Sequence, residues 1–270
     1  MGQLYQGAAQ EGGHLANGTI EDQANAPGSL TGADLKQALA SGWSDFRSAP
    51  AFGLFFASIF ALGGLALTYL LVARGELTWA IPAAAGFPLI APFTAVGLYE
   101  VSRRREQGLA MSWPAILGAV RGRGDEQILS MGVIIFVAFG FWLIVAHVIF
   151  SIAIVESGAG SESLEFLVTR PGLIMLALGS LVGGVMALAF YAVTLFSLPM
   201  LIDREVDFLT AIITSLAAFR ANLTVLLAWA FIIAVLLFIA MVPAFLGLLV
   251  VLPVLGHATW HLYRKTLSTD

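Results

Sequence analysis

The sequence predicts an all-α membrane protein, a polytopic bundle of six transmembrane helices with amphipathic helices at the interface. Composition is the first reason: 59% of the 270 residues are hydrophobic and only 11% are charged, whereas a soluble domain carries about 25% charged residues. The second reason is that the apolar residues gather in runs of about 20 or more, the length that crosses a bilayer as a helix. A mean hydropathy of +0.90 agrees with both observations.

The segment before the first apolar run has two parts. Residues 1–30 are rich in Gly, Ala and Gln, so we expect a flexible tail. Residues 31–48 predict a helix, because Thr31 and Asp34 resemble a capping box and the apolar residues recur on one face. Those residues are Leu35, Leu39, Trp43 and Phe46. We expect this amphipathic helix to lie along the membrane surface.

The membrane domain is expected over residues 50–265, with a short tail at 266–270. Its six spans are expected at 54–73, 77–99, 128–154 and 172–201, and as a hairpin within 223–263 that Pro243 divides. The second span contains Pro82, Pro88 and Pro92, so we expect it to be bent or broken. Broken helices often line polar sites in membranes, and helix packing is the alternative reason for such a bend.

The distribution of Lys and Arg predicts the orientation of the bundle. With both chain ends in the cytoplasm, eleven of the thirteen basic residues lie inside, and only Arg74 and Arg170 lie outside. This asymmetry follows the positive-inside rule. Arg103, Arg104 and Arg105 follow the second span, where they are expected to contact anionic lipid headgroups at the cytoplasmic face.

The chain also contains an internal repeat at an offset of 99 positions, with halves at about 77–154 and 172–245. In each half a span is followed by an Arg-Glu pair, an amphipathic helix (residues 109–120 in the first half) and a further Arg. The matched pairs are Arg105 with Arg204, Glu106 with Glu205, and Arg121 with Arg220. The two Arg-Glu pairs are expected either to form an ion-pair cluster between the halves or to contact lipid phosphates. A parallel repeat of this kind is compatible with a duplicated scaffold and with a transporter.

Small residues mark one further structural feature, in the fourth span. Gly179 and Gly183 are four residues apart, so they share a helix face and form a GxxxG pair. Such pairs let two membrane helices approach closely. We expect this face to pack against another helix.

Residues capable of chemistry are few. The chain has no cysteine, and it shows no Gly-rich phosphate loop, Ser-His-Asp pattern or zinc motif, so we expect neither an enzyme nor a bound cofactor or metal. His147, His257 and His261 are weak candidate ligands. His257 and His261 share a helix face and can bind a metal or a lipid phosphate. His147 lies about 25 Å from the inner end of its span, too deep to share a haem iron with them. An interfacial belt of aromatic and histidine side chains is the other interpretation.

Four phrases resemble a family of proteobacterial inner-membrane proteins that is catalogued as a domain of unknown function. They are GWSDFRSAPAFGLFFA (42–57), GFPLIAPFTAVGLYEVSRRR (86–105), LIDREVDFLTAI (201–212) and VLPVLGHATWHLYRK (251–265). The resemblance covers about residues 35–265 and implies a multi-pass α-helical protein of the bacterial cytoplasmic membrane. Some members are labelled as similar to cytochrome c oxidase subunit I. The four histidines of this chain are too few for an oxidase core.

These observations predict a non-catalytic accessory, assembly or scaffold subunit of a larger membrane complex, for example an electron-transport complex, or a homo-oligomer. Its expected partners are membrane lipids, including anionic lipids at the cytoplasmic face, and other membrane-protein subunits or itself, with no nucleic acid. One alternative is a small-solute transporter or channel with a polar cavity flanked by Pro88, Pro92, Thr94 and Tyr191. Another is a haem- or quinone-binding membrane protein.

Overall fold

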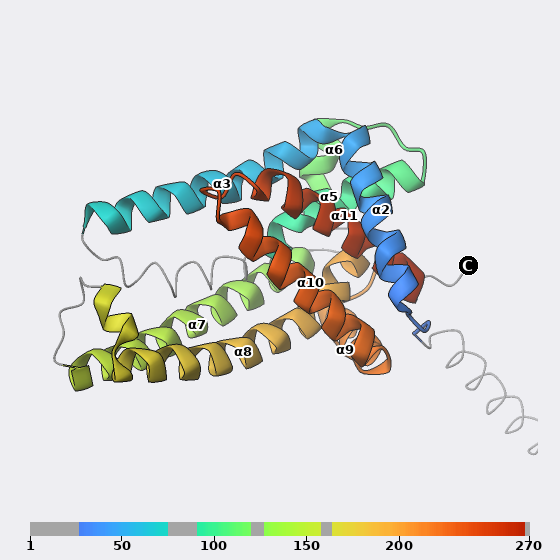
Figure 1. Cartoon of the computed structure of the whole chain (residues 1–270). Coiled ribbons are helices and arrows are strands. Elements are labelled where there is room, and N and C mark those ends of the chain that lie inside the picture. The colour runs from blue at the N-terminus through green and yellow to red at the C-terminus, as the bar shows by residue number, and fades with distance from the viewer. Residues whose placement is uncertain (1–26, 75–90, 120–126, 158–163, 268–270) are drawn as a thin grey trace, which may run out of the picture.

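The computed structural model describes residues 27–74, 91–119, 127–157 and 164–267, and every regular element in this part of the chain is a helix. The helices in chain order are α2 (Gly32–Ser48), α3 (Pro50–Ala73), α5 (Ala91–Glu106), α6 (Trp113–Gly118), α7 (Gln127–Ser157), the 3₁₀ helix η4 (Leu164–Val168), α8 (Arg170–Asp203), α9 (Phe208–Ala221), α10 (Leu223–Met241) and α11 (Leu248–Leu267). Figure 1 shows their arrangement. The prediction of an all-α membrane bundle is confirmed.

Among the described residues, four helices are long and apolar enough to cross a membrane: α3, α7, α8 and α10. Three of the expected spans and the first arm of the hairpin are thereby found. The expected second span is described only at its inner end, in α5, and Pro82 and Pro88 lie outside the described residues. α11, the expected sixth span, is not among the four, because its second half carries histidines and basic residues.

The α10–α11 hairpin turns before it reaches the far end of α3. Its turn contains Ala244 and Phe245, both in the left-handed region with φ of 52° and 64°, directly after the expected break at Pro243. A Cβ added to Gly64 of α3 would lie 2.7 Å from the Phe245 ring, so the turn contacts α3 at that level. Gly64 is about 21 Å along α3 from Pro50 at about 1.5 Å per residue, and α3 continues to Ala73. The turn of the hairpin therefore meets α3 before the C-terminal end of that helix.

The main hydrophobic core lies at one end of the molecule and takes its buried side chains mainly from α2, α5, α9, α10, α11, the start of α7 and the second half of α8. Its largest fully buried side chains include Trp260, Tyr263, Phe196 and Leu198. In the most apolar stretches of α7 and α8, by contrast, only 11% and 6% of the residues are buried. Figure 1 shows the α7–α8 pair extending away from this end, and the short helix η4 lies against α8. The molecule thus has a packed base, formed by the helices named above, and a projecting α7–α8 hairpin.

α2 begins at the expected residue and belongs to the packed base. The backbone N–H and the hydroxyl of Thr31 both donate to the Asp34 carboxylate, at 2.8 and 2.7 Å, as a capping box predicts. Its buried face packs along α11 (Figure 1). A Cβ on Gly42 would lie 2.5 Å from the carbonyl oxygen of Val254, so the two backbones touch at their crossing.

The described end of the expected tail also contacts the base. Gly28 N–H donates to the Thr266 carbonyl at 2.8 Å, and Leu30 N–H donates to the Asn222 side chain at 2.7 Å. These backbone hydrogen bonds fix the chain to the base from residue 28 on. Residues 1–26 lie outside the described part.

The amphipathic helix predicted over 109–120 is much shorter in the structure. After a left-handed turn at Gly108, with φ of 64°, helix α6 covers only Trp113–Gly118. Pro114 explains the late start, because proline favours the first turn of a helix and cannot lie in its interior. Trp113 packs on Phe52 and Phe55 of α3, with ring centroids 4.4 and 5.2 Å apart.

Candidate functional site

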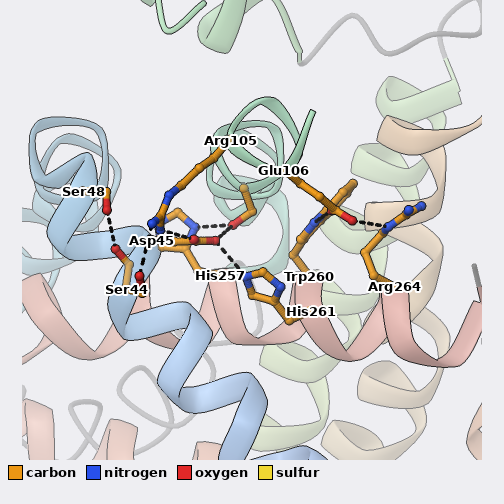
Figure 2. A network of polar contacts seen from close by, with 10 residues as sticks. Ser44, Asp45, Ser48, Arg105, Glu106, His257, Trp260, His261 and Arg264 are labelled. Atoms are coloured by element: carbon orange, nitrogen blue, oxygen red, sulfur yellow. Dashed lines mark hydrogen bonds and ion pairs between the residues drawn. The ribbon is translucent and has the colours of Figure 1, made fainter. Parts of the chain in front are cut away.

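The strongest concentration of polar side chains lies in the base, between α2, α5 and α11. Asp45 stands at its centre (Figure 2) and is 5% exposed. One carboxylate oxygen contacts Arg105, and the other accepts hydrogen bonds from Ser102 at 2.6 Å and from the His261 Nε2 at 2.9 Å. We call Asp45, Ser102, Arg105, His257 and His261 the Asp45 cluster. It joins three helices that lie far apart in the sequence.

The hydrogen bonds determine how the Asp45 carboxylate titrates. Burial alone would raise the pKa of Asp45, but the hydrogen bonds from His261 and Ser102 outweigh it, and the pKa lies below its usual value. The carboxylate is therefore ionised at neutral pH. It is the acceptor on which the donors of α5 and α11 converge.

His257 is fully buried at the edge of the same cluster. Its Nδ1 lies 2.8 Å from the Ser102 Oγ, whose own proton goes to Asp45. The Nδ1 must then carry the proton and donate to Ser102, which leaves the Nε2 as a bare acceptor. In the structure this Nε2 has no hydrogen-bond partner. The buried lone pair is the one unsatisfied polar atom of the Asp45 cluster.

The order of these groups does not support nucleophilic catalysis. In a Ser-His-Asp triad the histidine lies between the serine and the carboxylate and takes the serine proton. Here Ser102 lies between Asp45 and His257 and donates directly to Asp45. The described residues contain no group of three or more His, Cys, Asp or Glu side chains suited to a metal ion. The arrangement orients side chains and joins helices.

A second polar group continues along α11 from the Asp45 cluster. Glu106 accepts hydrogen bonds from Trp260 at 2.9 Å and from Arg264 at 3.0 Å, as Figure 2 shows. Arg264 also reaches Asp203 at the end of α8, at 3.1 Å, and the Tyr263 hydroxyl donates to the same carboxylate at 2.8 Å. α11 is thereby tied to both α5 and α8.

Two of the arginines expected to contact lipid phosphates, Arg103 and Arg104, pair with Glu100 of their own helix. Arg103 is 5% exposed and makes a two-pronged contact with Glu100, at 2.7 and 2.8 Å. Arg104 contacts the same carboxylate at 3.1 Å. Spacings of three and four residues on one helix face bring these charges together. Neutralisation by Glu100 explains why the basic group can lie in a packed region.

The two Arg-Glu pairs of the repeat have different surroundings in the structure. Arg105 and Glu106 contact Asp45, Trp260 and Arg264, as described above. Arg204 donates to the carbonyl of Leu267, and Glu205 is exposed. The four residues do not form the ion-pair cluster that the repeat suggested, because α2 and α11 supply the partners of the first pair. Arg220 is exposed at the end of α9, and Arg121 lies outside the described residues.

The remaining predicted residues lie away from the Asp45 cluster. His147 is on α7, which contacts α8 and α9 and not α11, so the structure does not bring it to His257 and His261. A Cβ on Gly183 would lie 2.3 Å from the Trp142 ring of α7, whereas one on Gly179 would meet open space. The two glycines of the GxxxG pair thus differ: one packs within the chain and the other is open.

A large cavity lies beside the polar groups, on the membrane side of the base. It has a volume of about 980 Å³ and is bounded by α3, α5, α8, α10 and α11. Its lining is mostly aliphatic and aromatic, with the hydroxyls of Tyr99, Tyr191, Thr194 and Thr259. Tyr191 was expected beside a polar cavity, and the lining contradicts that polarity. The side chains of Pro92 and Thr94 are not described, and Pro88 lies outside the described residues.

Sequence reasoning missed the centre of the polar site. Asp45 and Ser102 are 57 positions apart, and Asp45 and His261 are 216 apart, so no local spacing relates them. The sequence contains one signal. Asp45 lies between Trp43 and Phe46, which belong to the apolar face of the predicted amphipathic helix. A carboxylate at the edge of a buried face needs a partner, which is a reason to search other segments for one.

Comparison with known proteins gives one match. Residues 80–203 match the model of a family described as "Predicted integral membrane protein (DUF2189)". This region begins in the expected second span and ends at the last residue of α8. No curated protein and no solved structure matches the chain. The expected resemblance to a membrane family catalogued as a domain of unknown function is confirmed over residues 80–203.

Proposed function

We propose that this protein is a non-catalytic accessory or scaffold subunit whose packed base holds the α7–α8 hairpin against another membrane protein. The observation that carries the proposal is a contrast in packing. In the most apolar stretches of α7 and α8, 11% and 6% of the residues are buried within the chain, against 28% in the corresponding stretch of α3. Phe136 and Val185 on this hairpin are 76% and 64% exposed. The described part of the chain leaves these side chains exposed, which supports contact of the hairpin with other helices or with lipid.

Small residues on the same hairpin support a helix partner. A Cβ on Gly140 of α7 or on Gly179 of α8 would meet nothing within 4 Å. Small residues on open helix faces allow close approach of a second helix, which gains van der Waals contact that lipid tails give less well. The partner is either a different membrane subunit or a second copy of this chain.

The contacts between carboxylates and arginines in the base support a structural role for these polar groups. Asp45, Glu100, Glu106 and Asp203 each contact an arginine, so these carboxylates, of which Asp45 and Glu100 are buried, are neutralised by groups of the same chain. This interlocking fixes α2, α5, α8 and α11 relative to one another. It provides a rigid support for the hairpin.

The proposal places the base and both chain ends at the cytoplasmic face of a bacterial inner membrane. It rests on the distribution of Lys and Arg described above. Lys36, Arg47 and Arg220 are exposed in the structure and are available to anionic headgroups. The internal repeat gives this scaffold two related span-and-helix units, with α6 and α9 as their unequal surface helices.

Gentle purification from native membranes at native expression tests the proposal. We expect one or more protein chains to co-purify in fixed stoichiometry, or a defined homo-oligomer to elute. A variant with Phe at both Gly140 and Gly179 should lose that partner and keep its fold, whereas Phe at Gly118, another glycine with open space, should retain it. A monomer without any stoichiometric protein would contradict the proposal.

The apolar cavity does not support transport of a small polar solute, because a polar path needs polar groups to replace water. The haem alternative gains no support either, since His261 is bound to Asp45 and His257 is bound to Ser102.

A further inference from the structure

The cavity is open toward the lipid and closed toward the base. Phe231 and Phe238 of α10 line it, yet they are 70% and 72% exposed, and Gly184 of α8 lines it from an exposed position. Its entrance therefore lies between α8 and α10, on the surface that faces lipid tails. At the other end, Leu98, Tyr99 and Leu255 line it and are at most 5% exposed. A molecule dissolved in the bilayer would reach the cavity through this exposed, apolar part of its lining.

One hydroxyl at the closed end is free to donate. Tyr191 donates to the Leu226 carbonyl at 3.0 Å. Thr194 and Thr259 donate to carbonyls of their own helices, at 2.9 and 2.8 Å. The Tyr99 side chain is 4% exposed and makes no hydrogen bond to any described residue. Tyr99 lines the cavity, so an acceptor brought by a ligand would pair with its hydroxyl.

We propose that this cavity binds a membrane-dissolved molecule with a long apolar chain and a carbonyl oxygen, which accepts the Tyr99 proton. The volume of about 980 Å³ is at the upper end of ligand sites, which are mostly apolar with a few placed polar groups. It is also far larger than the apolar cavities that proteins leave empty. The carbonyl belongs either to an acyl-chain lipid or to an isoprenoid quinone, and both offer the same chemistry to Tyr99.

This site is independent of the proposed scaffold role. The cavity lies between α3, α8 and α10, whereas the proposed partner surface is on α7 and the open face of α8. Loss of ligand and loss of partner can therefore be separated by variants on the two surfaces.

Photolabelling in nanodiscs of phosphatidylethanolamine and phosphatidylglycerol tests the site. Two probes are compared: a phospholipid with a diazirine in its acyl chain, and a benzoquinone with a diazirine in its isoprenoid tail. We expect at least one probe to label residues at the closed end, such as Leu195 and Leu255, and an excess of the unlabelled probe to compete. The probe that does so identifies the source of the carbonyl.

Matched variants locate the entrance and the polar contact. G184F fills the entrance and should abolish labelling of the closed end, whereas G179F, on the same helix and also in open space, should leave it unchanged. Tyr99→Phe removes one hydrogen bond and should weaken binding about fivefold. Tyr191→Phe, whose hydroxyl is already bound, should weaken it less.

Two results would overturn the inference. One is that neither probe labels the closed end in the unaltered protein, or that the labelling does not saturate under competition, as expected for bulk lipid. The other is that G184F and G179F, both still folded by circular dichroism, label to the same extent. The competition experiment needs no variant, so a misfolded variant cannot leave the question open.

Discussion

At the scale of single residues, Asp45 determines how the base is held together. Its carboxylate receives donors from α5 and α11, and its own helix is α2 (Figure 2). Removing one member of such a buried group leaves the others without their partner, and this loss usually costs more than the intact contact contributes. We therefore expect the stability of the folded base to depend strongly on Asp45.

Asp45→Asn should lower the free energy of unfolding by about 3 kcal/mol, because it leaves Arg105 and His261 without a negative partner. Unfolding in detergent, followed by circular dichroism, measures the change. Glu205→Gln is the control, since this exposed residue should alter stability by no more than about 0.5 kcal/mol. Equal stability of the two variants would show that the cluster contributes little.

The lowered pKa of Asp45 also predicts how the free energy of unfolding depends on pH in the unaltered protein and in Asp45→Asn. Because the folded pKa lies below the unfolded value, the carboxylate stabilises the fold fully above about pH 4 and progressively less as pH falls through the folded pKa. The stability difference between the unaltered protein and Asp45→Asn should thus shrink as the pH falls below about 4. A difference that stays the same from about pH 5 to about pH 3 would contradict this assignment.

At the scale of elements, the close crossing of α2 and α11 rests on Gly42. Gly42→Ala would bring a methyl group to 2.5 Å from the Val254 carbonyl and 2.7 Å from the Ala258 nitrogen, so one helix must shift. We expect destabilisation of about 2 kcal/mol. Gly32→Ala in the same helix meets nothing within 4 Å and should leave stability unchanged or slightly raised. A thermal melt of both variants decides the matter, and equal melting temperatures would refute the close crossing.

The α10–α11 hairpin gives a second prediction at this scale. Because its turn meets α3 near Gly64, a cysteine at Ala244 should react with a membrane-impermeant maleimide from neither side of the membrane. Cysteines at Arg47, near the end of α2 just before α3, and at Arg74, directly after α3, should react from opposite sides. The absence of natural cysteine makes these labels specific. Reaction of the Ala244→Cys variant from the same side as Arg74→Cys would show that the hairpin crosses completely.

At the scale of the whole molecule, the sequence predicts spans better than contacts. Apolar runs predict α3, α7, α8 and α10, because hydrophobic length has a direct physical meaning in a bilayer. The sixth span is different, since the polar second half of α11 belongs to the base. Contacts such as Asp45 with His261 depend on how remote helices meet. The repeat predicted equal roles for Arg105 and Arg204, which differ because α2 lies outside the repeat.

The most direct test of the central claim, that the α7–α8 hairpin contacts another membrane protein, is site-specific photo-crosslinking in native membranes. A photoreactive side chain at Phe136 of α7 is compared with one at Leu62 of α3, which are 76% and 65% exposed. The account predicts a protein adduct of defined mass at Phe136 and lipid adducts alone at Leu62. Lipid adducts alone at both positions would contradict it, because the hairpin would then face only the bilayer.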